Sequence, residues 1–191
     1  MQLILASTSP FRKNVLEKLG LPFDCHAPEV DEAPQPGETP AQLVERLSIA
    51  KAQAVAAHLQ QGLVIGSDQV AVIDDEILGK PGNHENAVGQ LERASGKTVT
   101  FLTGLALVNA ESGAIQAEVV PFKVVFRQLT QPQIVNYLNA EQPYNCAGSF
   151  KSEGLGIALF DRLEGDDPNT LIGLPLIRLI RMLEKEGMTV I

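Results

Sequence analysis

The sequence predicts an α/β fold built as a two-lobed mixed sheet with a central cleft, and three features support this class. Short apolar runs alternate with segments of helical periodicity at both ends of the chain. The middle carries extended apolar segments on either side of a turn, which is typical of paired strands. The 191 residues, 45% of them hydrophobic, suit one domain over residues 1–191 with ample material for a core.

The chain opens with a strand that leads into a capped helix. Residues 3–6 (Leu-Ile-Leu-Ala) form a short apolar run. Ser9 is a typical N-cap, Pro10 suits the first helical position, and Gly20 supplies the stop. This order predicts a strand–helix unit at the N-terminus.

A proline-rich acidic loop over residues 28–40 separates this unit from a second helix. Thr39 and Gln42 have the spacing of a capping box. We therefore expect a helix that begins after Thr39 and runs to about Leu59.

A second apolar strand over residues 63–66 is expected to end where Ser67 and Asp68 interrupt the hydrophobic run. A further strand follows, and then a turn around Asp74 and Asp75. Ligands in α/β folds collect beyond the carboxyl ends of strands. Asp68 is therefore well placed for chemistry.

The rest of the chain continues the alternation of strands and helices. Glu-Ser-Gly at residues 111–113 predicts a turn between two strands, and Gly-Leu-Pro at 173–175 introduces the last helix. The expected elements are helices over residues 85–94 and 131–138, strands over 99–108 and 118–126, a glycine-bearing loop over 148–156, and a final helix that ends near Gly187.

The composition narrows the classes of function. A formal net charge of -8 opposes the binding of nucleic-acid polymers and anionic membranes, but it leaves open a small anionic substrate held by local cations. No apolar stretch is long enough to span a bilayer. Two cysteines, Cys25 and Cys146, are too few for a disulfide scaffold, which favours a cytoplasmic protein.

The first candidate site lies between the opening strand and its helix, where Ser7, Ser9 and Arg12 follow one another. A helix N-terminus offers free N–H groups and a partial positive charge, which together suit a phosphate. Serine hydroxyls and a guanidinium add further donors. A simple helix cap with exposed basic residues is the alternative interpretation.

Two lysines and two carboxylates are the other candidates. Lys51 borders the apolar stripe of its helix, so it either snorkels to solvent or points towards an anion. Lys80, in a Gly-Lys-Pro loop, faces either phosphates or solvent. Glu32 and Asp68 have the oxygen ligands that Mg²⁺ prefers, and an aspartate can also accept a proton from an attacking water. A turn-forming role for Asp68 is the alternative.

Taken together, the motifs resemble the Maf family. The motif Ser-x-Ser-Pro-x-Arg after the opening strand is similar to the N-terminal motif of that family, and the later blocks follow in its order and approximate spacing. These blocks are Val30-Asp31-Glu32, Lys51, Gly66-Ser67-Asp68-Gln69, Gly79-Lys80-Pro81, Ala94-Ser95-Gly96, Ala147-Gly148-Ser149-Phe150 and Ile172-Gly173-Leu174-Pro175-Leu176. The resemblance covers essentially the whole chain.

The resemblance implies a Maf/Ham1-like fold, similar to the inosine triphosphate pyrophosphatases, with the nucleotide in the cleft. It implies hydrolysis of a nucleoside triphosphate between the α and β phosphates. Asp68 would be the proton acceptor, and Glu32 and Asp68 would hold a divalent cation, Mg²⁺ or Mn²⁺. The residues implied to bind the triphosphate are Ser7, Ser9, Arg12, Lys51 and Lys80.

Three positions distinguish branches of the family. Where the branch acting on dTTP and UTP has Arg, Thr and Gln, this chain has Phe11, Gln69 and Glu153. The pattern resembles the branch that hydrolyses 7-methyl-GTP to 7-methyl-GMP and pyrophosphate. The expected partner is this small nucleotide, and a homodimer is left open. Two alternatives stay open: a preference for dTTP, UTP or other nucleotides, and a non-catalytic nucleotide-binding regulator of septum formation.

Overall fold

The computed structural model describes residues 1–191 and confirms a mixed α/β fold. The strands are β1 (Leu3–Ala6), β2 (Asp24–His26), β3 (Leu63–Ile73), β4 (Glu76–Leu78), β5 (Thr98–Asn109), β6 (Ile115–Phe126) and β7 (Phe160–Glu164). The helices are α1 (Pro10–Glu17), α2 (Pro40–Ala56), α3 (His84–Ala94), α4 (Gln131–Glu141), α5 (Pro168–Ile172) and α6 (Leu176–Lys185), with 3₁₀ turns η1 (Ala147–Ser149) and η2 (Leu155–Leu159).

The strands form one seven-stranded mixed sheet in the order β2-β1-β3-β5-β6-β7, with β4 paired to β3. The strand β1 runs parallel to both β2 and β3, whereas β3–β4 and β6–β7 are antiparallel. The chain divides into two compact units. Unit 1 holds residues Met1–Gln69, Leu102–Val120 and Asp167–Ile191, and unit 2 holds residues Val70–Phe101 and Pro121–Asp166.

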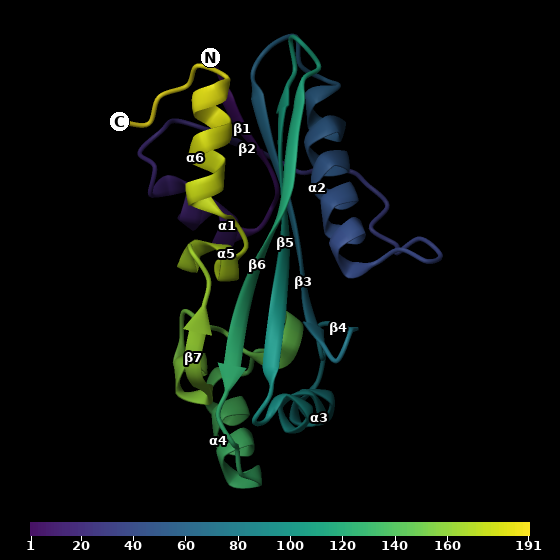
Figure 1. Cartoon of the computed structure of the whole chain (residues 1–191), viewed down its shortest axis with the longest axis vertical. Helices are drawn as coiled ribbons and strands as arrows, with labels where there is room; N and C mark the ends of the chain where they lie inside the picture. Colours follow the sequence, from purple (N-terminus) through teal and green to yellow (C-terminus); the bar gives the residue numbers. More distant parts are fainter. The chain divides into compact units, whose positions relative to one another are not determined.

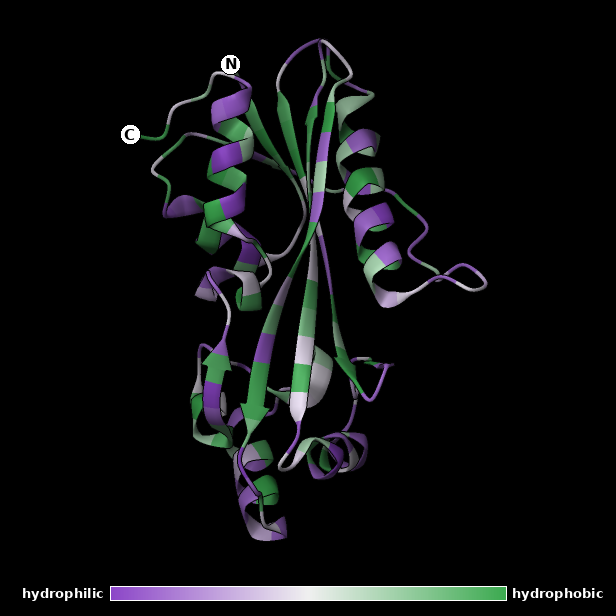
Figure 2. Cartoon of the chain, in the orientation of Figure 1, coloured by the Kyte–Doolittle hydropathy of each residue, from purple (hydrophilic) through white to green (hydrophobic).

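Unit 1 is an α/β/α sandwich, because its central strands β1 and β3 are buried and helices lie on both sides of them (Figure 1). Alternate strand residues point to opposite faces, so Leu5 and Ile65 pack with α1 and α6, whereas Ile4 and Val64 pack with α2. Figure 2 shows α2 and α6 with hydrophobic and hydrophilic segments alternating along each helix. Each helix therefore buries one stripe against the sheet and leaves the other in water.

The helix starts in unit 1 confirm the capping predictions. Ser9 caps α1, and Pro10 takes its first position. Thr39 and Gln42 form a full capping box at the start of α2, in which each side chain bonds to the backbone N–H of the other residue. These local contacts determine where both helices begin.

Unit 2 packs α3 and α4 with the parts of the strands that fall within it. Four phenylalanine rings form its aromatic cluster, with edge-to-face contacts and ring centroids 5.1 to 5.5 Å apart. Such pairs add stabilisation beyond the burial of their area. The rings belong to Phe101, Phe126, Phe150 and Phe160.

The structure corrects one prediction about the sheet. The strand that was expected to stop at Ser67 and Asp68 continues without a break to Ile73. Its polar residues stay in the strand because each finds a partner: Ser67 donates to a backbone carbonyl, and Asp68 pairs with a lysine. Asp68 therefore lies inside a strand and not beyond its end. The predicted turn at Asp74 and Asp75 is confirmed, and both residues have positive φ.

Candidate functional site

The start of α1 holds the first group of predicted residues. The Oγ of Ser9 accepts a hydrogen bond from the backbone N of Arg12 at 3.3 Å, and the Oγ of Ser7 accepts one from the backbone N of Ser9 at 3.1 Å. Both hydroxyls thus stand at a helix N-terminus and order its first turn. Phe11, on the same turn, is 43% exposed, so its ring is open to contact from outside the unit.

The side chain of Arg12 is held by a carbonyl from the other end of the sequence. Its Nε donates to the carbonyl oxygen of Gly173 at 2.9 Å, and the Oγ of Ser67 donates to the same oxygen at 2.9 Å. Burial lowers the pKa of Arg12, whereas the negative charges of Asp68 and Glu32 raise it. The guanidinium is therefore fixed in direction and lies within the field of two carboxylates.

Lys51 is the centre of a charged cluster that it forms with Asp68 and Glu32. Its side chain is only 8% exposed, and its Nζ lies 2.7 Å from Oδ1 of Asp68 and 2.9 Å from Oε1 of Glu32. A buried ammonium is costly unless it is paired, and here two carboxylates pair with it. The alternative in which Lys51 snorkels to solvent is therefore wrong. The side chain of Asp68 is 12% exposed and that of Glu32 is 61% exposed, so the cluster opens to water on the Glu32 side.

The strand β3 separates two sets of polar contacts by its alternation. Asp68 points to α2, whereas Ser67 and Gln69 point to the opposite face. The Nε2 of Gln69 donates to Oγ1 of Thr103 and to the carbonyl oxygen of Thr170, both at 2.9 Å. The amide nitrogen of Gln69 is therefore engaged within unit 1, and its predicted role in substrate specificity stays a prediction.

Two glycines, Gly66 and Gly104, bring α2 close to the sheet. A Cβ on Gly66 would lie 2.0 Å from the carbonyl oxygen of Ser48, and one on Gly104 would lie 2.0 Å from that of Val44. No side chain fits at either position, so the helix backbone rests directly on β3 and β5. An isolated glycine inside a strand signals such an approach. This contact is what allows Lys51 to reach the strand.

Lys80 belongs to unit 2, where it is exposed on a loop held by α3. The carbonyl oxygen of Gly79 accepts a hydrogen bond from Nε2 of Gln90, and that of Pro81 accepts one from Nδ2 of Asn86, both at 3.0 Å. The backbone on each side of Lys80 is thus anchored to one helix, while the residue itself is exposed. A phosphate-binding role for Lys80 stays a prediction.

Glu153 also belongs to unit 2 and is exposed. It accepts a hydrogen bond from Oγ of Ser152 at 3.3 Å. The neighbouring Lys151 is engaged elsewhere, because its Nζ donates to the carbonyl oxygen of Glu141 and its backbone N donates to the hydroxyl of Tyr137. Burial raises the pKa of Tyr137, so this hydroxyl is protonated at neutral pH. The specificity role of Glu153 stays a prediction.

The cluster around Lys51 has a donor set that fits a hard divalent cation. Carboxylate oxygens of Glu32 and Asp68 converge on one ammonium, so they surround a position where positive charge is favoured. No group of three or more His, Cys, Asp or Glu side chains is arranged to hold a metal. Two carboxylates suit Mg²⁺, which usually keeps several waters and binds substrate phosphates as well.

The arrangement in unit 1 can bind and polarise an anion. Arg12 lies in the first turn of α1, within the electrostatic field of Asp68 and Glu32, and Lys51 on α2 pairs with Asp68, a carboxylate with little exposure. Cations and backbone N–H groups attract phosphate, and a carboxylate can take a proton from water.

None of the helices combines the length and the apolar composition that a membrane span requires.

Comparisons with known proteins agree with the motifs. Residues 2–186 match the family described as Maf-like protein. A curated 7-methyl-GTP pyrophosphatase from Colwellia psychrerythraea is 62% identical over 189 residues, which cover 99% of this chain and 94% of that protein. A solved HAM1 protein from Coxiella burnetii has a TM-score of 0.47 at 15% identity, over 80% of this chain and 88% of that chain. The Ham1 protein of Staphylococcus aureus has a TM-score of 0.43 at 16% identity, over 69% of this chain and 73% of that chain.

Proposed function

The chain belongs to the Maf-like protein family, and on that premise we propose that it hydrolyses 7-methyl-GTP to 7-methyl-GMP and pyrophosphate. The observation that carries this proposal is the 62% identity, over nearly the whole length of both proteins, to a curated enzyme named for that activity. The contacts of Arg12, Lys51 and Asp68 support it, because they provide cations and a carboxylate for chemistry at a phosphate.

Asp68 is the residue we propose as proton acceptor. Its Oδ1 is occupied by the Lys51 ammonium at 2.7 Å, so Oδ2 is the oxygen that accepts the proton of the attacking water. The water oxygen then bonds to the α-phosphorus, and the bond from that phosphorus to the bridging oxygen breaks. Pyrophosphate leaves with the electron pair of the broken bond.

The cationic residues stabilise the charge that develops during this step. Arg12 is oriented by the Gly173 carbonyl and would offer its remaining donors to phosphate oxygens, and the hydroxyls of Ser7 and Ser9 stand at the same helix end. Glu32 and Asp68 would hold Mg²⁺ or Mn²⁺. When bound, such a cation neutralises negative charge on the phosphate oxygens.

Net charge and cysteine chemistry support a small nucleotide as the substrate and the cytoplasm as the compartment. A net charge of -8 favours a small nucleotide held by local cations over a nucleic-acid polymer. The two cysteines are free thiols, which fits the cytoplasm.

A panel of nucleotides with detection of released pyrophosphate tests the proposal. We expect kcat/KM for 7-methyl-GTP to exceed the values for GTP, UTP and dTTP when Mg²⁺ or Mn²⁺ is present. Asp68→Asn should keep the fold and nucleotide affinity while turnover falls by about 10²–10⁴-fold, the usual contribution of a general base. Equal efficiency on UTP would refute the substrate assignment. Near-normal turnover in Asp68→Asn would remove Asp68 from the mechanism.

A further inference from the structure

The segment that carries Glu32 has no secondary structure of its own. Residues 31–37 are all exposed, and the side chain of Glu32 is 61% exposed. Exposed loops that bury few side chains are mobile unless polar contacts hold them. The position of the Glu32 carboxylate at Lys51 therefore depends on what anchors this segment to the rest of unit 1.

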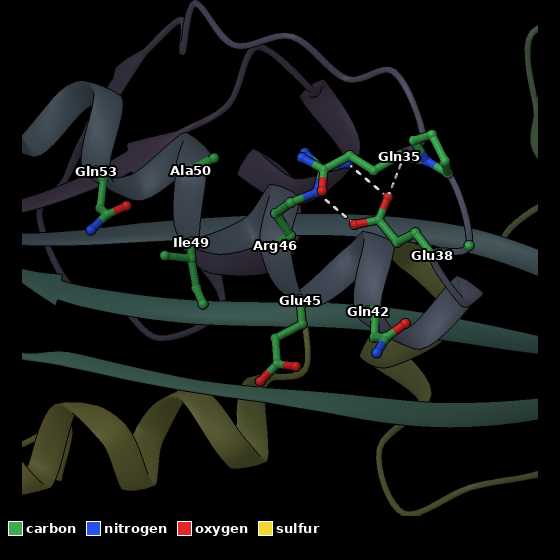
Figure 3. Close-up of a pocket in the computed structure, with 10 residues that line it drawn as sticks. Gln35, Glu38, Gln42, Glu45, Arg46, Ile49, Ala50 and Gln53 are labelled. Carbon is green, nitrogen blue, oxygen red and sulfur yellow. Dashed lines mark hydrogen bonds and ion pairs between the residues drawn. The ribbon is translucent and has the colours of Figure 1, made fainter.

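Arg46 on α2 makes that anchor. Its Nε lies 2.6 Å from Oε1 of Glu38, and its Nη2 lies 2.9 Å from Oε2 of the same residue (Figure 3). The same Nη2 donates to the carbonyl oxygen of Ala33 at 3.1 Å, directly after Glu32. Glu38 in turn accepts from the backbone N of Gln35 at 2.9 Å. One guanidinium thus closes the segment at both ends, and we name this set of contacts the Arg46 latch.

A hollow of about 620 Å³ lies beside the latch, lined by residues of α2 and of the segment itself. Figure 3 shows Arg46 and Glu38 at this hollow, with Ile49 and Gln53 further along α2. The segment therefore borders open space on this side and does not rest on a packed core there. Its polar contacts to α2 are what keep it in place.

The latch differs from the ordinary surface ion pairs of this protein. Its side chains are 28% and 7% exposed, whereas those of Arg181 and Glu184 are 68% and 41% exposed. Fully exposed pairs contribute little, because water and salt screen them. A shielded, bidentate arginine–carboxylate pair with a further bond to a carbonyl fixes geometry as well as charge. Lysine could replace only its charge and not its two-point contact, because an ammonium lacks the planar fork.

We propose that Arg46 is a positioning residue for the proposed pyrophosphatase reaction, and this inference rests on that proposed function. The Arg46 latch fixes the backbone next to Glu32, so that the Glu32 carboxylate reaches Lys51 and the position where a divalent cation would bind. Arg46 acts through Glu32 and does not touch the substrate. Its loss leaves the catalytic residues in place but lets Glu32 move away from them.

A double-mutant cycle with hydrogen exchange tests this role. The variants are Arg46→Gln, Glu32→Gln and their combination. Arg181→Gln is the matched control, because Arg181 is also a helix arginine that pairs with a glutamate. On the best nucleotide of the panel, Arg46→Gln should lower kcat/KM by about 10-fold, the lower end of the usual effect of outer-shell partners. It should cause no further loss in the Glu32→Gln background. Arg46→Lys should recover part of the loss.

Hydrogen exchange supplies a readout that does not depend on turnover. In Arg46→Gln, amides of residues 31–38 should exchange faster, while those of β1 and β3 keep the protection of the wild type. An active wild type with Arg46→Gln indistinguishable from Arg181→Gln would overturn the inference. So would equal losses in both backgrounds, or unchanged exchange in the segment. A wild type that is inactive on every nucleotide refutes the proposed function instead.

Discussion

Replacing Gly66 by alanine tests whether the contact between α2 and the sheet sets the geometry of the candidate site. The new Cβ would lie 2.0 Å from the carbonyl oxygen of Ser48 and 2.9 Å from the backbone N of Ala52. Real Cβ atoms essentially never approach heavy atoms within 3.0 Å. Both neighbours are helix backbone and cannot rotate away. The helix must therefore retreat from β3 by about 1 Å, as in other overpacked cores.

A shift of that size acts on both stability and catalysis. Overpacking typically costs about 1–3 kcal/mol of the free energy of unfolding. Lys51 directly precedes Ala52, so the same movement stretches its 2.7 Å contact with Asp68. A misplacement of about 1 Å at reacting groups can lower a rate by about 10²-fold. We therefore expect Gly66→Ala to lose activity far beyond what its loss of stability explains at the assay temperature.

The assay combines thermal unfolding with kcat/KM for pyrophosphate release. Gly89→Ala is the matched control, since Gly89 lies inside α3 and a Cβ there meets nothing within 4 Å. The free energy of unfolding of that control should rise by about 0.5–1 kcal/mol, as it does for glycine-to-alanine changes inside helices. If Gly66→Ala kept wild-type stability and activity, α2 would not rest on the strand, and this reasoning about the site would be wrong.

Three further predictions concern single side chains. Lys51→Ala and Lys80→Ala should each weaken triphosphate binding. If the kinetics of nucleotide hydrolysis were unchanged in either variant, that lysine would have only a structural or solvent-exposed role. Glu153→Gln should reduce the preference for 7-methyl-GTP over UTP, because a carboxylate can accept two hydrogen bonds from guanine but faces carbonyls on uracil; an unaltered ranking would contradict this. The hydrogen bonds from Arg46 and then Gln35 lower the pKa of Glu38 to about 2. The wild type should therefore have a higher free energy of unfolding than Glu38→Gln, and this difference should be greatest above a pH of about 4.3, the ordinary glutamate pKa. The difference should shrink as the pH falls towards 2, and urea unfolding of both proteins across that range would measure it.

Local signals made part of the fold predictable. Thr39 and Gln42 determine the start of α2 through contacts three residues apart, so the capping box could be found without any tertiary information. The continuation of β3 through Ser67 and Asp68 could not be found in this way. Their partners, the Gly173 carbonyl and Lys51, lie 106 and 17 residues away in sequence. A polar residue inside a strand resembles a strand end until its distant partner is known.

Short elements were missed for a related reason. The strand β2 has only three residues, all exposed, and no apolar pattern distinguishes it. It exists because its backbone pairs with β1 in parallel register. The helix α5 was also missed, although Asp167 followed by Pro168 is a typical N-cap and first position. There the signal was present, but five residues give too few periods for a helical pattern.

The candidate residues themselves could be predicted by type but not by contact. Sequence spacing gave no reason for Lys51 to meet Glu32, since the loop between β2 and α2 has no periodic pattern. The meeting depends on Arg46, which folds the segment back onto the helix that carries Lys51. In the sequence, Arg46 and Lys51 look like an ordinary charged face of one helix. Only the structure shows that the guanidinium of Arg46 binds the carbonyl oxygen of Ala33.

Helix α2 therefore couples three features of the candidate site. It carries Lys51, it holds the Glu32 segment through Arg46, and its distance from Asp68 is limited by Gly66. Residues that depend on one rigid element have non-additive effects when they are substituted. Changes at Arg46 and Gly66 should thus each cost less in a Lys51→Ala background than in the wild type, because the contact that they position is already absent. Equal costs in both backgrounds would mean that α2 contributes to the site through some contact other than the Lys51 pair with Asp68 and Glu32.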